Sequence, residues 1–142
     1  MKEFPKRRLG TRRNYRQSAP SKGRSFQIAV STILLRAIHQ HSEPQYHANF
    51  HPVFSEIHRL MVELGFRKIY DEKKIATLQF TQATEITHIQ LHYGVKNYSM
   101  LSALQQIWFE ETWITEEEFP TFNKFLQYLF HLGWEIYKQQ KL

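Results

Sequence analysis

The chain has 142 residues, about the length of one domain, and 42% of them are hydrophobic, which is enough to bury a core. The absence of cysteine excludes a disulfide framework, thiolate zinc sites and a cysteine nucleophile. The formal net charge of +6 is spread very unevenly along the sequence.

The basic residues gather at the N-terminus. The first 24 residues hold nine of the 19 Lys and Arg residues and one acid, Glu3, whereas the rest of the chain holds ten basic and twelve acidic residues. Gly, Pro and Ser interrupt this segment, so it cannot bury enough apolar surface to fold alone. We therefore expect a flexible basic arm at residues 1–24, followed by a single globular domain at residues 25–142.

The composition of the arm suits contact with phosphates. Arginine guanidinium groups bind phosphate bidentately and stack on bases, and Tyr15 adds an aromatic face. The pattern predicts nucleic-acid binding, with RNA slightly favoured over DNA. The predicted contacts in the arm are Lys6, Arg7, Arg8, Arg12, Arg13, Tyr15, Arg16, Lys22 and Arg24. A nuclear import signal, a site for a protein partner and a solubilising tail are alternative roles for the same charges.

The domain is predicted to begin with two helices. Apolar residues recur at steps of three and four over residues 25–41, and Ser25 precedes them as a plausible N-cap. A second helix is predicted over residues 53–64, where apolar residues again recur on one side. Gly65 would then end this helix, because glycine readily adopts the left-handed conformation of a helix terminus.

After Gly65 the apolar pattern changes to the alternation of strands. Residues 66–70 and 75–80 are predicted to form a hairpin around a charged turn at residues 71–74. A third strand is predicted over residues 89–95. These three segments would form an antiparallel meander.

Helical spacing returns over residues 98–108, and a last helix is predicted over residues 121–139. Thr115 and Glu118 have the spacing of a capping box ahead of that helix. The expected fold is therefore α+β, with two N-terminal helices, a three-stranded antiparallel meander and two C-terminal helices, preceded by a disordered basic arm. The aromatic residues of the C-terminal half predict a docking surface for a protein partner.

The predicted order of elements over residues 57–80 is also the local order of a winged-helix DNA-binding domain. The exposed side of its helix would carry Glu56, His58, Arg59 and Glu63, which is not a basic reading surface, so ordinary α+β packing is favoured. The hairpin offers four basic residues that would still grip a nucleic-acid backbone: Arg67, Lys68, Lys73 and Lys74.

Histidine is the residue type from which a metal site would have to be built. Five histidines lie between residues 39 and 58, while His88 and His92 lie in a predicted strand at a reach of about 13 Å, which is poor for joint ligation. No HExxH motif is present, so surface and loop positions are favoured for these residues, and no metal or cofactor is expected. A metal site, if present, would use His47, His51 and His58.

No catalytic motif stands out in the chain. Capping and solvation explain Glu110, Glu111 and residues 116–118, and there is no GxSxG or Walker motif. We therefore predict a non-catalytic nucleic-acid-binding protein that is a small accessory subunit of a larger ribonucleoprotein or DNA-processing complex. Its arm would bind phosphates and its body would dock on protein.

Two alternative functions remain open. One is a protein-interaction adaptor, viral or plasmid-borne, whose arm is a nuclear or partner-targeting signal. The other is a His-dependent metal hydrolase. The sequence has neither an apolar signal segment at its N-terminus nor an apolar run of the roughly 18 residues that a membrane span requires. The expected location is cytoplasmic or nuclear/nucleoid, with no membrane partner and no secretion.

Overall fold

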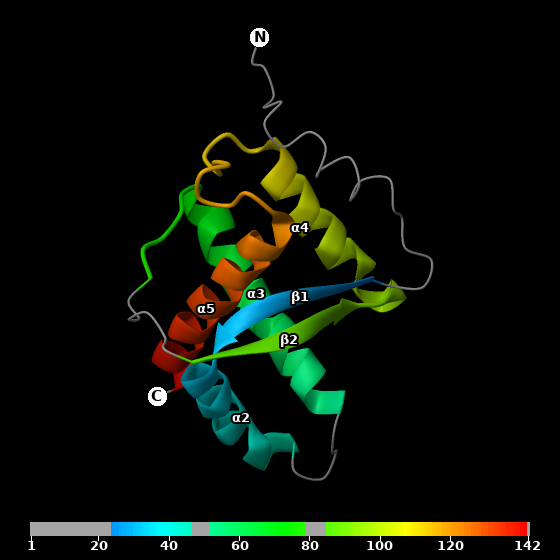
Figure 1. Cartoon of the computed structure of the whole chain (residues 1–142), viewed down its shortest axis with the longest axis vertical. Coiled ribbons are helices and arrows are strands. Elements are labelled where there is room, and N and C mark those ends of the chain that lie inside the picture. Colours follow the sequence, from blue (N-terminus) through cyan, green and yellow to red (C-terminus); the bar gives the residue numbers. More distant parts are fainter. Residues whose placement is uncertain (1–23, 47–51, 79–84, 142) are drawn as a thin grey trace.

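A computed structural model describes residues 24–46, 52–78 and 85–141. These residues form an α+β structure in which helices pack against a two-stranded antiparallel sheet (Figure 1). The elements in chain order are β1 (Arg24–Ser31), α2 (Thr32–Tyr46), α3 (Pro52–Glu72), β2 (Ile86–Tyr93), the 3-10 helix η3 (Val95–Asn97), α4 (Tyr98–Glu110) and α5 (Phe122–Lys141). Residues 1–23 of the predicted arm lie outside the described residues.

The first element is a strand, although a helix was predicted over residues 25–41. Phe26, Ile28 and Val30 are buried, whereas Gln27 is exposed, which is the alternation of a strand with one face on the core. The prediction of a helix from Ser25 is therefore wrong. Phe26, Ile28 and Val30, which belong to the apolar residues of the predicted helix, also alternate along a strand, and their side chains pack on the core.

Helix α2 begins only after the strand. Ser31 accepts a hydrogen bond at its Oγ from the backbone N–H of Leu34, at 3.3 Å, as an N-cap residue does. The start signal thus lies six positions beyond the one predicted at Ser25. Ile33, in the first turn of α2, is 70% exposed, so the apolar stripe assumed for one long helix is interrupted here.

The sheet pairs β1 with β2 in antiparallel order, so that Arg24 lies opposite Tyr93 and Ser31 lies opposite Ile86. One face packs on the core, and the other is exposed and polar. The exposed polar side chains of that second face belong to Ser25, Gln27, His88, Gln90 and His92.

The predicted three-stranded meander is wrong. Residues 66–72 continue α3, residues 75–78 have no regular structure, and residues 79–80 lie outside the described residues. The third predicted strand, over residues 89–95, overlaps β2, which is displaced toward the N-terminus. The predicted arrangement of two N-terminal helices followed by three strands is not matched, although the α+β class is correct.

Gly65 lies inside α3 and does not end it. A Cβ atom at Gly65 would overlap the carbonyl oxygen of Leu129 in α5, and a Cβ atom at Gly133 in α5 would overlap the carbonyl oxygen of Met61 in α3. On each helix, the glycine and the residue whose carbonyl oxygen is approached are one helical turn apart. Helices α3 and α5 therefore cross with their backbones touching, and Figure 1 shows this crossing.

The two predicted C-terminal helices are confirmed as α4 and α5. Thr121 is the N-cap of α5, because its Oγ1 accepts a hydrogen bond from the backbone N–H of Lys124 at 3.2 Å. The predicted capping pair also forms, since the Glu118 N–H donates to Thr115 Oγ1 at 3.3 Å. It closes a turn ahead of α5 and does not begin the helix.

Most of the described aromatic residues of the C-terminal half are buried in the core. The Phe122 ring lies 5.3 Å from the Phe26 ring and 5.6 Å from the Trp108 ring, measured between centroids, so this cluster joins α5 to β1 and α4. The buried aromatic side chains of this half include Trp108, Phe119, Phe122, Phe125, Phe130, Trp134 and Tyr137. They are packed inside the protein, where a partner would not reach them.

We expect Gly133→Ala to lower the free energy of unfolding by about 3 kcal/mol, because the added methyl group forces the α3 and α5 backbones apart. Urea denaturation would measure this loss. Gly94→Ala is the matched control, since its added Cβ would come no closer than 3.7 Å to His92 Nε2, and it should cost less than about 1 kcal/mol. Equal stability of the two variants would contradict the close crossing of the helices.

Candidate functional site

Most of the predicted nucleic-acid contacts lie in residues 1–23, outside the described residues. Arg24 is the exception, and it is the first residue of β1. Its guanidinium carbon lies 5.3 Å from the centroid of the Phe26 ring, and its backbone pairs with Tyr93. The basic segment therefore joins the domain at one end of the sheet, at the point where β2 ends.

The four basic residues predicted for a hairpin lie instead at the C-terminal end of α3 and in the turn after it: Arg67, Lys68, Lys73 and Lys74. Arg67 forms an ion pair with Glu63, and Lys68 forms one with Glu72, at 2.8 Å. Because these carboxylates offset part of the positive charge, this end of α3 is only weakly basic. The predicted hairpin of the winged-helix order is not found in the described residues, since residues 66–72 are helical and residues 75–78 have no regular structure.

The histidine predicted for an exposed helix face is buried. His58 in α3 is 8% exposed, and its Nε2 lies 2.9 Å from Nε2 of His39 in α2. The Phe130 ring of α5 lies edge-on to the His58 ring, at 5.7 Å between centroids. Burial lowers the pKa of His39, and burial together with the charges of His39 and Arg59 lowers the pKa of His58 to about 4. The neutral pair thus links α2 to α3 through one N–H···N bond.

The metal ligands considered from the sequence are not brought together here. His47 and His51 lie outside the described residues, and the Nε2 of His58 faces His39. Over residues 24–46, 52–78 and 85–141, no group of three or more His, Asp or Glu side chains is placed to hold a metal ion.

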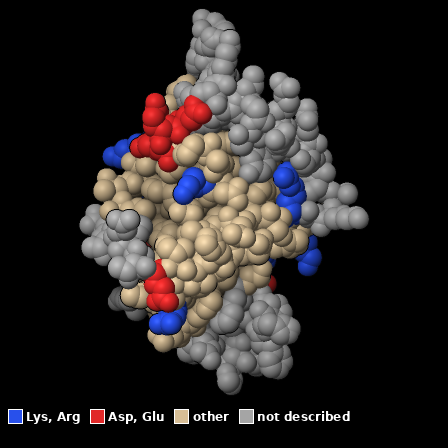
Figure 2. Space-filling model, in the orientation of Figure 1, with Lys and Arg blue, Asp and Glu red and all other residues tan. Residues whose placement is uncertain are grey.

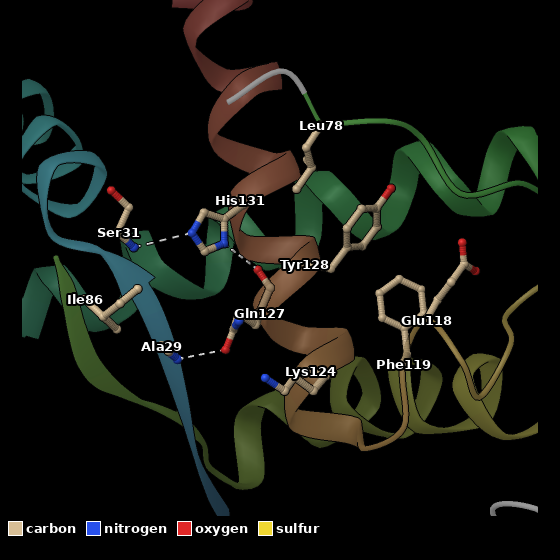
Figure 3. Close-up of a pocket in the computed structure, with 10 residues that line it drawn as sticks. All are labelled: Ala29, Ser31, Leu78, Ile86, Glu118, Phe119, Lys124, Gln127, Tyr128 and His131. Atoms are coloured by element: carbon tan, nitrogen blue, oxygen red, sulfur yellow. Dashed lines mark hydrogen bonds between the residues drawn. The ribbon is translucent and has the colours of Figure 1, made fainter. Parts of the chain in front are cut away.

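A cleft of about 430 Å³ lies between the outer edge of β1 and α5 (Figure 3). The side of α5 that faces this edge carries Asn123, Gln127 and His131. Asn123 Nδ2 donates to the Gln27 carbonyl oxygen at 2.8 Å, and Gln127 Oε1 accepts from the Ala29 N–H at 3.0 Å. His131 Nε2 accepts from the Ser31 N–H at 3.5 Å. Side chains of α5 therefore occupy the edge of β1 that a third strand would otherwise pair with.

His131, Gln127 and Tyr128, which line this cleft, form hydrogen bonds that hold the fold. The Nδ1 atom of His131 carries the ring proton, because its partner at 2.8 Å is the Gln127 carbonyl oxygen, which only accepts. Burial lowers the pKa of His131, which keeps the ring neutral. The Tyr128 hydroxyl donates to the Ala76 carbonyl oxygen at 2.6 Å, and burial raises the pKa of Tyr128 to about 12. We therefore assign no reaction to this cleft.

A second hollow, of about 560 Å³, lies at the Arg24 end of the sheet; we call it the sheet-end groove. Its lining includes Ser55, Glu56, Arg59, His92, Lys96 and Asn97. These residues come from α3 and from the consecutive elements β2 and η3, and α3 is distant in sequence from the other two. Sequence reasoning missed the groove because no local spacing links Arg59 to Lys96; only the packing of α3 under the sheet brings them together.

Comparison of the chain with known protein families, with characterised proteins and with solved structures finds no match. None of the helices in the described part of the chain is both long enough and apolar enough to cross a membrane. The charges and geometry of this chain are therefore the basis for assigning a function.

The buried histidine pair predicts a loss of stability in acid. Because the folded-state pKa of His58 is about 4, below the ordinary value of 6.5, the unfolded chain binds the proton more readily. The stabilisation is fully present above about pH 6.5 and is lost as the pH falls toward 4, by up to about 3 kcal/mol at about 1.4 kcal/mol per pH unit. Thermal or urea unfolding between these pH values would measure it.

The His58→Gln variant should show a correspondingly smaller loss of stability over the same pH interval. His88→Gln, which replaces an exposed histidine on the polar face of the sheet, serves as the matched control. An acid-induced loss as large in His58→Gln as in the unaltered protein would contradict the role given to the buried pair.

Proposed function

We propose that the protein is a non-catalytic nucleic-acid-binding protein whose N-terminal arm contacts the phosphate backbone. One observation carries this proposal: nine Lys and Arg residues stand against one acid in the first 24 residues, which leaves a charge of about +8. When a segment so rich in arginine binds a polyphosphate, the release of counterions contributes favourable free energy. Its affinity for the polyphosphate therefore falls steeply as the salt concentration rises. RNA is favoured slightly over DNA, because guanidinium groups and Tyr15 also stack on unpaired bases.

The connection of the arm to the domain supports the proposal. Arg24 is the first residue of β1. This strand pairs with β2 along one edge, and side chains of α5 form hydrogen bonds with its other edge. A bound polyanion would therefore be attached to a rigid element. The described domain also has a face that disfavours phosphate, since acidic side chains gather over the connection between α4 and α5 (Figure 2): Glu111, Glu116, Glu117 and Glu118.

We also propose that the domain is an accessory subunit of a larger ribonucleoprotein or DNA-processing complex, cytoplasmic or nuclear/nucleoid, and that it docks on protein. The buried aromatic residues do not supply this surface. Ile33 and Ile86 are 70% and 48% exposed, and both lie near the end of the sheet where Ser31 pairs with Ile86. A protein partner would bury these residues while the opposite end of the sheet holds the arm.

Replacement of five arm residues tests the proposal: Arg7, Arg8, Arg12, Arg13 and Arg16, all to Gln. Binding of a fluorescein-labelled oligouridine would be followed by fluorescence anisotropy between about 50 and 200 mM salt. We expect weaker binding to all sequences alike, and a plot of log affinity against log salt that is shallower by about four.

The control replaces two exposed lysines of α5, Lys124→Gln and Lys138→Gln, and should bind as the unaltered protein does. An arm variant that retained its affinity would refute phosphate binding by the arm. Purification of a protein complex that survives nuclease treatment would, in that case, favour the adaptor function, with the arm as a targeting signal.

A further inference from the structure

We propose that the sheet-end groove is a second phosphate site, which binds the backbone of the same nucleic-acid strand that the arm holds. This inference rests on the proposed function and adds to it a folded contact surface. Arg59 and Lys96 bind the phosphate, and neither residue belongs to the arm.

Two hydrogen bonds fix the Arg59 side chain and leave some of its N–H donors unused. Its Nη1 atom donates to the His92 carbonyl oxygen at 2.8 Å and to Ser55 Oγ at 3.2 Å, so the guanidinium is tied to both β2 and its own helix. A guanidinium group has five N–H donors, and these two bonds use only those on Nη1. Within the described part of the chain, the donors on Nη2 and Nε have no acceptor. A fixed guanidinium with a free edge is preorganised for a phosphate oxygen.

The charges around Arg59 favour an anion. Lys96 in η3 is exposed and lines the same groove, and Glu56 is the one acid among the described lining residues. Glu63 lies one turn beyond Arg59 on α3, but it pairs with Arg67. No ion pair neutralises Arg59 or Lys96 within the described residues, so the groove keeps a net positive charge.

The groove lies where the arm leaves the domain. Arg24 pairs with Tyr93, and the neighbours of Tyr93 on both sides, His92 and Gly94, line the groove. Lys and Arg side chains are visible at the right-hand edge of the molecule in Figure 2, level with the start of β1 in Figure 1. A strand bound by the arm would therefore reach the groove without crossing the acidic face.

An exposed aromatic ring beside the groove favours a phosphate group of nucleic acid over a free phosphate ion as the ligand. Tyr98 follows Asn97 of the groove directly and is 41% exposed. A phosphate site beside an exposed tyrosine resembles the alternation of cationic and stacking groups with which proteins bind single strands. A free phosphate ion would use the groove but would gain nothing from the ring.

The test uses the full chain with Arg59→Gln and Lys96→Gln combined, and measures oligouridine binding by anisotropy across a salt titration. We expect about tenfold weaker binding and a salt plot shallower by about one, as for the loss of one phosphate contact. Because Arg59→Gln also removes two internal hydrogen bonds, Lys96→Glu is measured as a second variant. It should weaken binding severalfold and leave the unfolding midpoint unchanged, since this side chain is exposed.

The double variant Lys124→Gln and Lys138→Gln removes the same number of charges elsewhere and should change binding less than twofold. If both groove variants bind like the unaltered protein while the arm variant is weakened, the groove site is refuted and the arm function stands. If the groove and arm variants all bind normally, both proposals fail. An equal loss in the α5 control would show a general effect of charge and would refute the groove site.

Discussion

The crossing of α3 and α5 is the constraint on which the other contacts depend. Gly65 and Gly133 remove the two side chains that would keep these helices apart, so each helix places its backbone against the other. This crossing is the most extensive packing between helices in the described structure. Because α5 also bonds to β1, and α3 bonds to β2 through Arg59, the spacing of the helix pair sets where both strands lie.

The sheet depends on its helices more than most sheets do. Two strands alone are marginally stable in water, and here the free edge of β1 is satisfied by Asn123, Gln127 and His131 of α5. The apolar face of the sheet is covered by aromatic residues such as Phe122. The polar residues along one side of α5 thus have a structural explanation, and their contacts hold the strand to which the arm is joined.

The sequence predicted those elements whose pattern has only one interpretation. Helices α4 and α5 were found because their apolar spacing is long and uninterrupted. The α+β class was predicted from three strands, of which only the one around Leu91 overlaps a strand of the structure. The segment from Phe26 to Ile38 was misassigned because its apolar residues fit both a helix and a strand followed by a helix. Gly65 was taken as a helix end because a local pattern does not reveal that another backbone passes at that point.

The candidate site, like the fold, was only partly predictable from the sequence. The charge of the arm is a property of consecutive residues, so the sequence alone was enough to propose a phosphate partner. The groove is assembled from Arg59, His92 and Lys96, which tertiary packing brings together. Arg59 was expected only on an exposed helix face that also carries two glutamates. The histidine pair was missed for the same reason, because His39 and His58 are 19 positions apart and meet only when α2 packs on α3.

The position of Arg24 at the start of β1 has a mechanical consequence. A partner that held the arm would pull along the axis of the strand, and the ladder to β2 lies nearly perpendicular to that axis. Tension would then load these bonds in shear, all at once, together with the side-chain bonds from α5 on the other edge. Such an attachment resists force much better than one whose bonds open singly.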